Sequence, residues 1–125
     1  MPAEIQFQNT LSGRKEAFVP MQKDEVRIYT CGPTVYDFAH IGNFRTFVFQ
    51  DILRRFLARR GFRVFQVMNL TDVDDRIIAN AAAAGKSIRD YTDRFIAAFK
   101  EDCQALALEP PEKLVRATDH IEDMV

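Results

Sequence analysis

Apolar residues in the middle of the chain recur every four positions and stop before a glycine: Phe44, Val48, Ile52, Phe56, then Gly61. This spacing predicts an amphipathic helix over residues 43–60. Short runs rich in β-branched and aromatic residues flank it, over 26–31 and 62–70, and they predict strands. The second run shows little alternation, which is typical of a strand covered on both faces. The three segments together predict a parallel βαβ unit.

A turn signal near the N-terminus predicts a separate hairpin. Two short apolar stretches, around residues 5–7 and 17–19, are separated by Ser12 and Gly13. A serine-glycine pair between short apolar runs is typical of a turn that joins two strands. We therefore expect an α/β fold in which a short β-hairpin precedes the parallel βαβ core.

The pattern beyond the second strand is helical. Residues 74–84 are rich in alanine and predict a short helix, and Ser87 followed by Asp90 resembles a capping box that opens another. Apolar residues then share one face of this second helix: Phe95, Phe99 and Cys103. The proline pair at 110–111 ends the pattern, and residues 118–125 predict the start of a further helix.

Composition narrows the class of protein. The chain has 125 residues, 47% of them hydrophobic, and a net charge of −1. It fits a single compact domain, and its charge gives no global electrostatic footprint for nucleic acid. No stretch reaches the roughly 18 uninterrupted apolar residues of a membrane helix, so we expect a cytoplasmic protein. In that compartment Cys31 and Cys103 are expected to be free thiols.

Candidate chemistry lies at one edge of the predicted unit. Ligands of parallel α/β sheets bind outside the carboxyl ends of the strands. Cys31 ends the first predicted strand, residues 69–71 end the second, and residues 40–43 form the loop that enters the helix between them. Three sets of polar groups are therefore expected to converge on one crevice.

The entry to the first helix has the features of a phosphate site. A helix start offers unpaired backbone N–H groups and the positive end of a dipole, and Gly42 would let a ligand approach the backbone. His40 and Asn43 can add side-chain donors to phosphate oxygens. From spacing alone, however, a lone histidine near a helix start is more often a structural cap or a surface residue than a phosphate ligand.

Three motifs occur in a specific order: Tyr29 to Asp37 (YTCGPTVYD), His40 to Asn43 (HIGN) and Asn69 to Asp75 (NLTDVDD). In this order they closely resemble the cysteinyl-tRNA synthetase family, and the likeness covers essentially the whole chain. The resemblance implies a Rossmann-like, HUP-type fold and a reaction in which ATP activates cysteine for transfer to tRNA(Cys).

The resemblance also implies roles for individual residues. Residues 33–43 match the "HIGH" region of class I synthetases, with Asn43 in place of the final histidine, so the residues expected to bind ATP are His40, Gly42 and Asn43, with His40 and Asn43 acting in catalysis. The residues expected to bind cysteine are Gly32, Thr34 and Thr71. Cys31 matches a ligand of the family's zinc ion, and Mg²⁺ is expected to accompany ATP.

The expected zinc site is incomplete in this sequence. Zinc sites use about four ligands, and the other sulfur or nitrogen donors, Cys103, His40 and His120, have no metal-binding spacing with Cys31. In the family the remaining ligands, the KMSKS loop and the anticodon-binding domain lie further along the chain. We therefore expect residues 1–125 to be an N-terminal part of the catalytic domain, with the connective insertion beginning near the C-terminal end, and to be inactive alone.

Other interpretations remain open at this level. A nucleotidylyltransferase, a cysteine ligase of the mycothiol type and a stand-alone nucleotide-binding module would share parts of these motifs. Asp72, Asp74 and Asp75 could bind a metal, although acidic residues at a helix start more often favour the helix dipole. Four arginines at the end of the first helix could contact tRNA or form a solvated face: Arg54, Arg55, Arg59 and Arg60.

Overall fold

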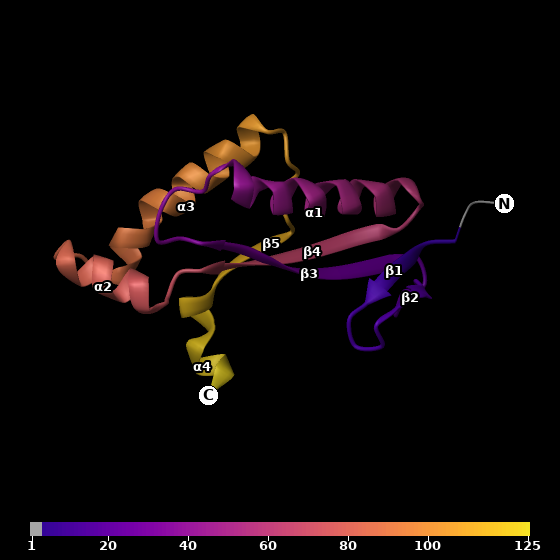
Figure 1. Cartoon of the computed structure of the whole chain (residues 1–125), viewed down its shortest axis with the longest axis horizontal. Helices are drawn as coiled ribbons and strands as arrows, with labels where there is room; N and C mark the ends of the chain where they lie inside the picture. Colours follow the sequence, from indigo (N-terminus) through magenta and orange to yellow (C-terminus); the bar gives the residue numbers. More distant parts are fainter. Residues whose placement is uncertain (1–3) are drawn as a thin grey trace.

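The computed structural model describes residues 4–125 and shows a small hairpin beside an α/β core (Figure 1). In chain order the elements are β1 (Gln6–Asn9), β2 (Arg14–Ala17), β3 (Glu25–Thr34), α1 (Ile41–Arg59), β4 (Arg63–Thr71), α2 (Asp75–Ala83), α3 (Ile88–Ala105), β5 (Lys113–Arg116), the 3₁₀ turn η1 (Ala117–His120) and α4 (Ile121–Met124). The predicted hairpin is confirmed: β1 pairs antiparallel with β2, and Gly13 takes a φ of 69° in the turn.

The core sheet is parallel and has the order β3-β4-β5. The predicted βαβ unit is confirmed as β3-α1-β4, and a second crossover through α2 and α3 leads to β5. The sequence pattern did not predict β5. It comprises the four residues KLVR, directly after the proline pair and a glutamate, and so short a run has no periodicity of its own.

The hydrophobic core lies between the sheet and the helices α1 and α3. Its buried aromatic residues include Phe44 and Phe47 from α1 and Phe99 from α3, which pack against one another and against Met68 of β4. Figure 1 shows α1 and α3 on the same side of the strands. This packing fixes the start of α1 over the ends of β3 and β4.

The prediction that the strand at 62–70 is covered on both faces was wrong for the part of the chain described. Gln66, Met68 and Leu70 of β4 are buried, but Phe65, which points to the other face, is 37% exposed. Tyr29 of β3 is 69% exposed. Burial therefore alternates along β4, as it does in a strand with one covered face.

Among the element boundaries that differ from the prediction, two affect the site. The first strand does not stop before Gly32; β3 continues to Thr34, with a shift in register after Cys31. Proline lacks an N–H for the ladder, so the glycine-proline pair interrupts pairing without ending the strand. The first helix begins at Ile41, so residues 41–43 form its first turn instead of a loop.

Side-chain caps open the next two helices. Asp74 precedes α2 and accepts a hydrogen bond from the backbone N–H of Ile77 at 2.7 Å, which favours the capping role over the metal role weighed for it. Ser87 precedes α3 and accepts from the N–H of Asp90 at 3.0 Å, as its position predicted. These caps set where both helices start after β4.

Arg54 and Arg55 of α1 were expected either to contact tRNA or to face solvent, but both are bound to other parts of the chain. Arg54 donates to the carbonyl of Pro110 at 2.6 Å and is paired with Glu112, while Arg55 donates to the carbonyl of Ala107 at 2.8 Å. They tie the segment that follows α3 to the surface of α1.

Across residues 4–125, none of the helices has the length and apolar character needed to cross a bilayer.

Candidate functional site

A cavity of about 380 Å³ opens where the end of β3 meets the start of α1. It is lined by residues of the β3 end, the connecting loop and the first turns of α1: Cys31, Gly32, Pro33, Thr34, Tyr36, Asp37, Phe38, Ala39, His40, Gly42, Asn43, Thr46 and Phe47. Six of the seven residues predicted for the site lie in this lining. The exception is Thr71, which lies outside the lining but pairs with Thr34, a residue of the lining.

His40 is the N-cap of α1. Its backbone is extended, and its ring nitrogen Nδ1 accepts a hydrogen bond from the backbone N–H of Gly42 at 3.0 Å. A ring nitrogen that accepts carries no proton, so the neutral ring holds its proton on Nε2. His40 can therefore have both of the roles considered for it. Its Nδ1 caps the helix, and its Nε2–H remains available to donate to a phosphate oxygen.

Asn43 completes the cap from the other side. Its Oδ1 accepts from the backbone N–H of His40 at 3.0 Å, which leaves the amide Nδ2 as its donor. The expectation of unpaired backbone donors does not hold for two residues of this helix start, because the N–H of Gly42 is held by His40 Nδ1 and that of Asn43 by the carbonyl of His40. At these two positions the donors available to an anion are the side-chain N–H groups.

Gly42 makes room for the His40 ring. A Cβ atom at this position would lie 2.8 Å from His40 Cε1 and 3.0 Å from Nδ1, so the ring would have to move from its place against the helix. The glycine was predicted to admit a ligand close to the backbone. Its observed contact is with the imidazole, which can sit against the first turn only because no side chain intervenes.

Gly32 is required by the neighbouring strand. A Cβ atom there would lie 2.0 Å from the backbone oxygen of Asn69. The N–H of Gly32 donates to Asn69 Oδ1 at 3.3 Å, and Asn69 Nδ2 donates to the hydroxyl of Thr71 at 3.1 Å. Asn69 thus links the first strand to Thr71, a role that the sequence did not reveal because it depends on strand register.

Thr34 and Thr71 are direct partners at the ends of β3 and β4. Immediately after them, the N–H of Val35 donates to the carbonyl of Thr71 at 3.0 Å. The convergence of strand ends expected from the parallel topology is therefore observed. Thr71 supports the wall that carries Thr34 and does not itself line the cavity.

Comparison with known proteins identifies the family. Residues 17–125 match the family described as "tRNA synthetases class I (C) catalytic domain". The chain belongs to this cysteinyl-tRNA synthetase family. It is 58% identical over 120 residues to the "Cysteine--tRNA ligase" of Koribacter versatilis, covering 96% of this chain and 24% of the relative. It is 57% identical over 121 residues to that of Solibacter usitatus (97% and 26%), and 44% identical over 121 residues to that of Pyrococcus furiosus (97% and 25%).

This cysteinyl-tRNA synthetase family member spans about a quarter of the length of these relatives. The match begins in β2 and includes every element that builds the cavity. The catalytic-domain assignment and the Rossmann-like α/β fold predicted from the motifs are confirmed.

A complete metal centre is not formed within residues 4–125, where no three or more histidine, cysteine, aspartate or glutamate side chains cluster as ligands. Cys31 is a free, exposed thiol in the cavity wall, and its carbonyl accepts from Gln50 Nε2 at 3.1 Å. Cys103 is half-buried, and burial, together with the negative charge of Asp102, raises the pKa of its thiol to about 11. The donor set fits a single thiolate ligand contributed by Cys31.

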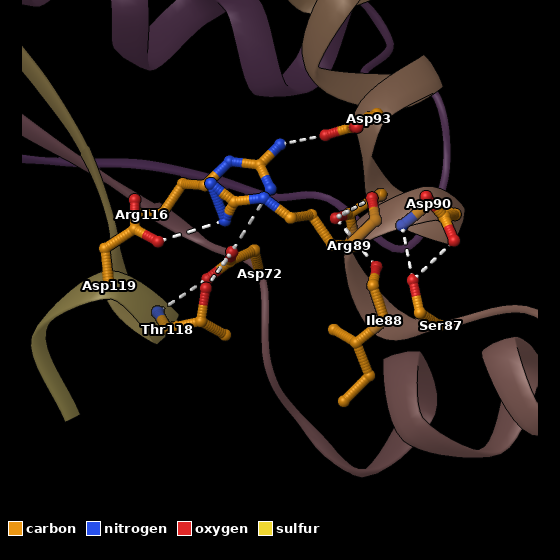
Figure 2. A network of polar contacts seen from close by, with 10 residues as sticks. Asp72, Ser87, Ile88, Arg89, Asp90, Asp93, Arg116, Thr118 and Asp119 are labelled. Atoms are coloured by element: carbon orange, nitrogen blue, oxygen red, sulfur yellow. Dashed lines mark hydrogen bonds and ion pairs between the residues drawn. The ribbon is translucent and has the colours of Figure 1, made fainter.

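A polar network lies beside the carboxyl end of β4 (Figure 2). The buried Asp72, which directly follows Thr71, holds Thr118 through two hydrogen bonds and lies 3.9 Å from Arg116 Nη1. Arg116 also pairs with Asp93 of α3. Asp72 is thus structural, which is a third role beside the metal and helix-dipole interpretations considered for this acidic cluster.

Proposed function

We propose that this chain carries the cysteine- and ATP-binding part of a cysteine–tRNA ligase active site. The whole protein would join cysteine to the α-phosphate of ATP, release pyrophosphate, and transfer the cysteinyl group to tRNA(Cys) in the cytoplasm. One observation supports this most strongly. The residues predicted to bind ATP and zinc, and two of the three predicted to bind cysteine, line one cavity in a chain that belongs to this family: Cys31, Gly32, Thr34, His40, Gly42 and Asn43.

In this proposal the start of α1 binds the ATP phosphates. His40 Nε2–H and Asn43 Nδ2–H are the donors that remain after the cap is formed, and both belong to the same helical turn. Because the cap holds both side chains in one geometry, the donors are in place before substrate arrives. Mg²⁺ bound with ATP would offset the remaining phosphate charge.

Cysteine would bind between the end of β3 and the start of α1. Gly32 and Thr34 form the wall, and Thr71 holds Thr34 in place through the paired strand ends. The cavity brings the carboxylate of cysteine close to the phosphate site, so activation depends on positioning more than on a protein base. The His40 and Asn43 side chains would donate hydrogen bonds through Nε2–H and Nδ2–H.

Cys31 would contribute one thiolate to zinc, with the remaining ligands coming from residues outside those described. When bound, zinc would supply a soft Lewis acid that accepts the thiolate of the substrate and discriminates against serine and alanine. Cys31 suits this role because it is exposed in the wall of the cavity and its backbone is fixed by Gln50.

A chimera would test this proposal. This chain would replace the matching part of the Koribacter versatilis ligase, to which it is 58% identical, and cysteine-dependent ATP–pyrophosphate exchange would be measured. We expect exchange in the chimera and its loss in the Cys31→Ala and His40→Ala versions. A folded chimera without exchange, or a Cys31→Ala version with full exchange, would contradict the proposal.

A further inference from the structure

The pairing of β3 with β4 is interrupted beside the cavity. The two strands are paired in register up to Cys31 and Asn69, and pairing resumes at Thr34 and Thr71. Two residues of β3 therefore lie opposite one residue of β4, which is the two-against-one pattern of a β-bulge. Pro33, inside the bulge, has no N–H to donate to the neighbouring strand. This part of β3 is held less firmly by strand pairing than the rest.

Two side chains hold a single peptide group at the interruption. The carbonyl of Cys31 accepts a hydrogen bond from Gln50 Nε2 at 3.1 Å, and the N–H of Gly32 donates to Asn69 Oδ1 at 3.3 Å. This carbonyl and this N–H belong to the same peptide bond, which joins Cys31 to Gly32. Because a peptide group is planar, holding both of its polar atoms restricts the backbone rotations of the two residues that it joins. Gln50 from α1 and Asn69 from β4 thus form a clamp on this peptide.

The hydrogen bonds of the clamp run in one direction. A backbone carbonyl only accepts and a backbone N–H only donates, so Gln50 presents Nε2 to the peptide and Asn69 presents Oδ1. Asn69 then donates through Nδ2 to the hydroxyl of Thr71 at 3.1 Å. The chain of donors therefore leads from Gln50 through the peptide and Asn69 to Thr71. Hydrogen bonds linked in one direction polarise and strengthen one another, so loss of one side of the clamp weakens the other.

Gln50 contributes little to the stability of the fold. Its Oε1 is buried and has no hydrogen-bond partner among the described residues, which is unfavourable. The carbonyl that its Nε2 holds belongs to Cys31, an exposed residue, so water can satisfy that oxygen when the side chain is absent. The contact of Gln50 with the cavity wall therefore matters more for the site than for folding.

We propose that Gln50 and Asn69 are positioning residues of the cysteine site, which clamp the Cys31–Gly32 peptide so that the Cys31 thiol and the Gly32 wall keep one arrangement. Cys31 and Gly32 both line the cavity at the start of α1. Gln50 and Asn69 lie outside that lining, so they act on the site through the backbone. The step from the clamp to cysteine binding rests on the proposed function.

The first experiment tests whether the two sides of the clamp are coupled. Exchange of the Gly32 amide hydrogen would be followed by ¹H–¹⁵N spectroscopy in the wild-type chain and in Gln50→Met, with Gln104→Met, at an exposed position of α3, as the matched control. In Gln50→Met we expect about fivefold faster exchange, the value of one neutral hydrogen bond, with no loss of stability in urea. Unchanged Gly32 exchange, or faster exchange that only follows a general loss of stability, would overturn the proposal.

Variants of Asn69 test the other side of the clamp. Asn69→Asp keeps Oδ1 as the acceptor for the Gly32 N–H, whereas Asn69→Leu removes the acceptor at similar volume. We expect Gly32 to remain protected in Asn69→Asp and to exchange about fivefold faster in Asn69→Leu. Loss of Gly32 protection in folded Asn69→Asp would count against the clamp.

The last experiment measures the consequence for the site. Calorimetry would compare the binding of ATP and of a hydrolysis-resistant cysteinyl-adenylate analogue to the wild-type chain, Gln50→Met and Gln104→Met. Gln50→Met should bind the analogue about fivefold more weakly and ATP as the wild type does, because the cap of α1 fixes His40 and Asn43 independently of the clamp. Equal weakening of both ligands, or of neither, would overturn the proposal. A wild-type chain that binds neither ligand contradicts the proposed function, and Gly32 exchange then decides whether the clamp exists.

Discussion

The carboxylate of Asp72 accepts two hydrogen bonds from Thr118, one from the backbone N–H at 3.0 Å and one from the hydroxyl at 2.6 Å. Asp72 is only 1% exposed, and these bonds, with the nearby Arg116, satisfy its buried charge. They join the end of β4 to the segment that leaves β5. The residue before Asp72 is Thr71, so the same contact steadies one wall support of the candidate site.

Removing this carboxylate should destabilise the whole core. Asp72→Ala removes both acceptors of Thr118 and one of the two carboxylates near the half-buried Arg116, which keeps its pair with Asp93, and we expect the free energy of unfolding to fall by about 3 kcal/mol. Thr118→Val keeps the backbone hydrogen bond and should cost about 1.5 kcal/mol. Urea unfolding measures both. Glu101→Ala, at an exposed position of α3, is the control and should change stability by about 0.5 kcal/mol or less.

The two glycines of the site should respond differently to alanine. Gly32→Ala drives a Cβ atom into the backbone of Asn69, which cannot move without breaking the sheet, so we expect little or no cooperative unfolding transition. Gly42→Ala meets only the His40 side chain, which can rotate away. It should fold, with stability reduced by about 1 kcal/mol for the lost cap. Thermal unfolding followed by circular dichroism separates the outcomes, and equal losses would contradict this interpretation.

His40 offers a way to separate structure from chemistry. Asparagine is among the best N-cap residues, so His40→Asn retains the cap of α1 but lacks the Nε2–H donor. His40→Ala loses both. We expect His40→Asn to keep wild-type stability while losing ATP binding, and His40→Ala to lose ATP binding and about 1 kcal/mol of stability. If His40→Asn bound ATP as tightly as the wild type, the imidazole would have no role in binding phosphate.

The thiol of Cys103 gives a pH-dependent prediction. Its pKa is raised from 9.0 to about 11, chiefly by burial, so the folded chain holds the thiol proton more tightly than the unfolded chain does. The stability linked to this group is fully present below pH 9 and is lost as pH rises toward 11. Cys103→Ser, which does not ionise in this range, should remove that part of the decline in urea unfolding between these pH values. An unchanged decline would contradict the prediction.

Local patterns predicted most of the elements because each carries its own signal. The four-residue apolar spacing of α1, the glycine after it and the serine before α3 all act within one or two helical turns. The carboxyl-end rule for parallel strands then placed Cys31 and residues 40–43 at one cavity. These inferences do not require knowledge of the strand register, that is, of which residues of neighbouring strands are paired.

The remaining features depend on contacts between distant segments. Strand β5 is too short to show a pattern and exists because it pairs with β4. The bond between Asp72 and Thr118 joins residues 46 positions apart, and the contact between Gly32 and Asn69 is set by register. The exposed face of β4 was mispredicted for a related reason, since an apolar run does not reveal whether helices pack on one face of the strand or on both.

Direct binding at the cavity is the decisive measurement. A hydrolysis-resistant cysteinyl-adenylate analogue would be titrated into the 125-residue chain while backbone amides are followed by ¹H–¹⁵N spectroscopy, with the seryl analogue as the control. We expect saturable shifts concentrated at residues 31–34 and 40–43, weaker binding of the seryl analogue, and loss of the shifts in His40→Asn. Shifts that are absent, or that fall elsewhere in a folded chain, would contradict the assignment of this cavity to cysteine and ATP.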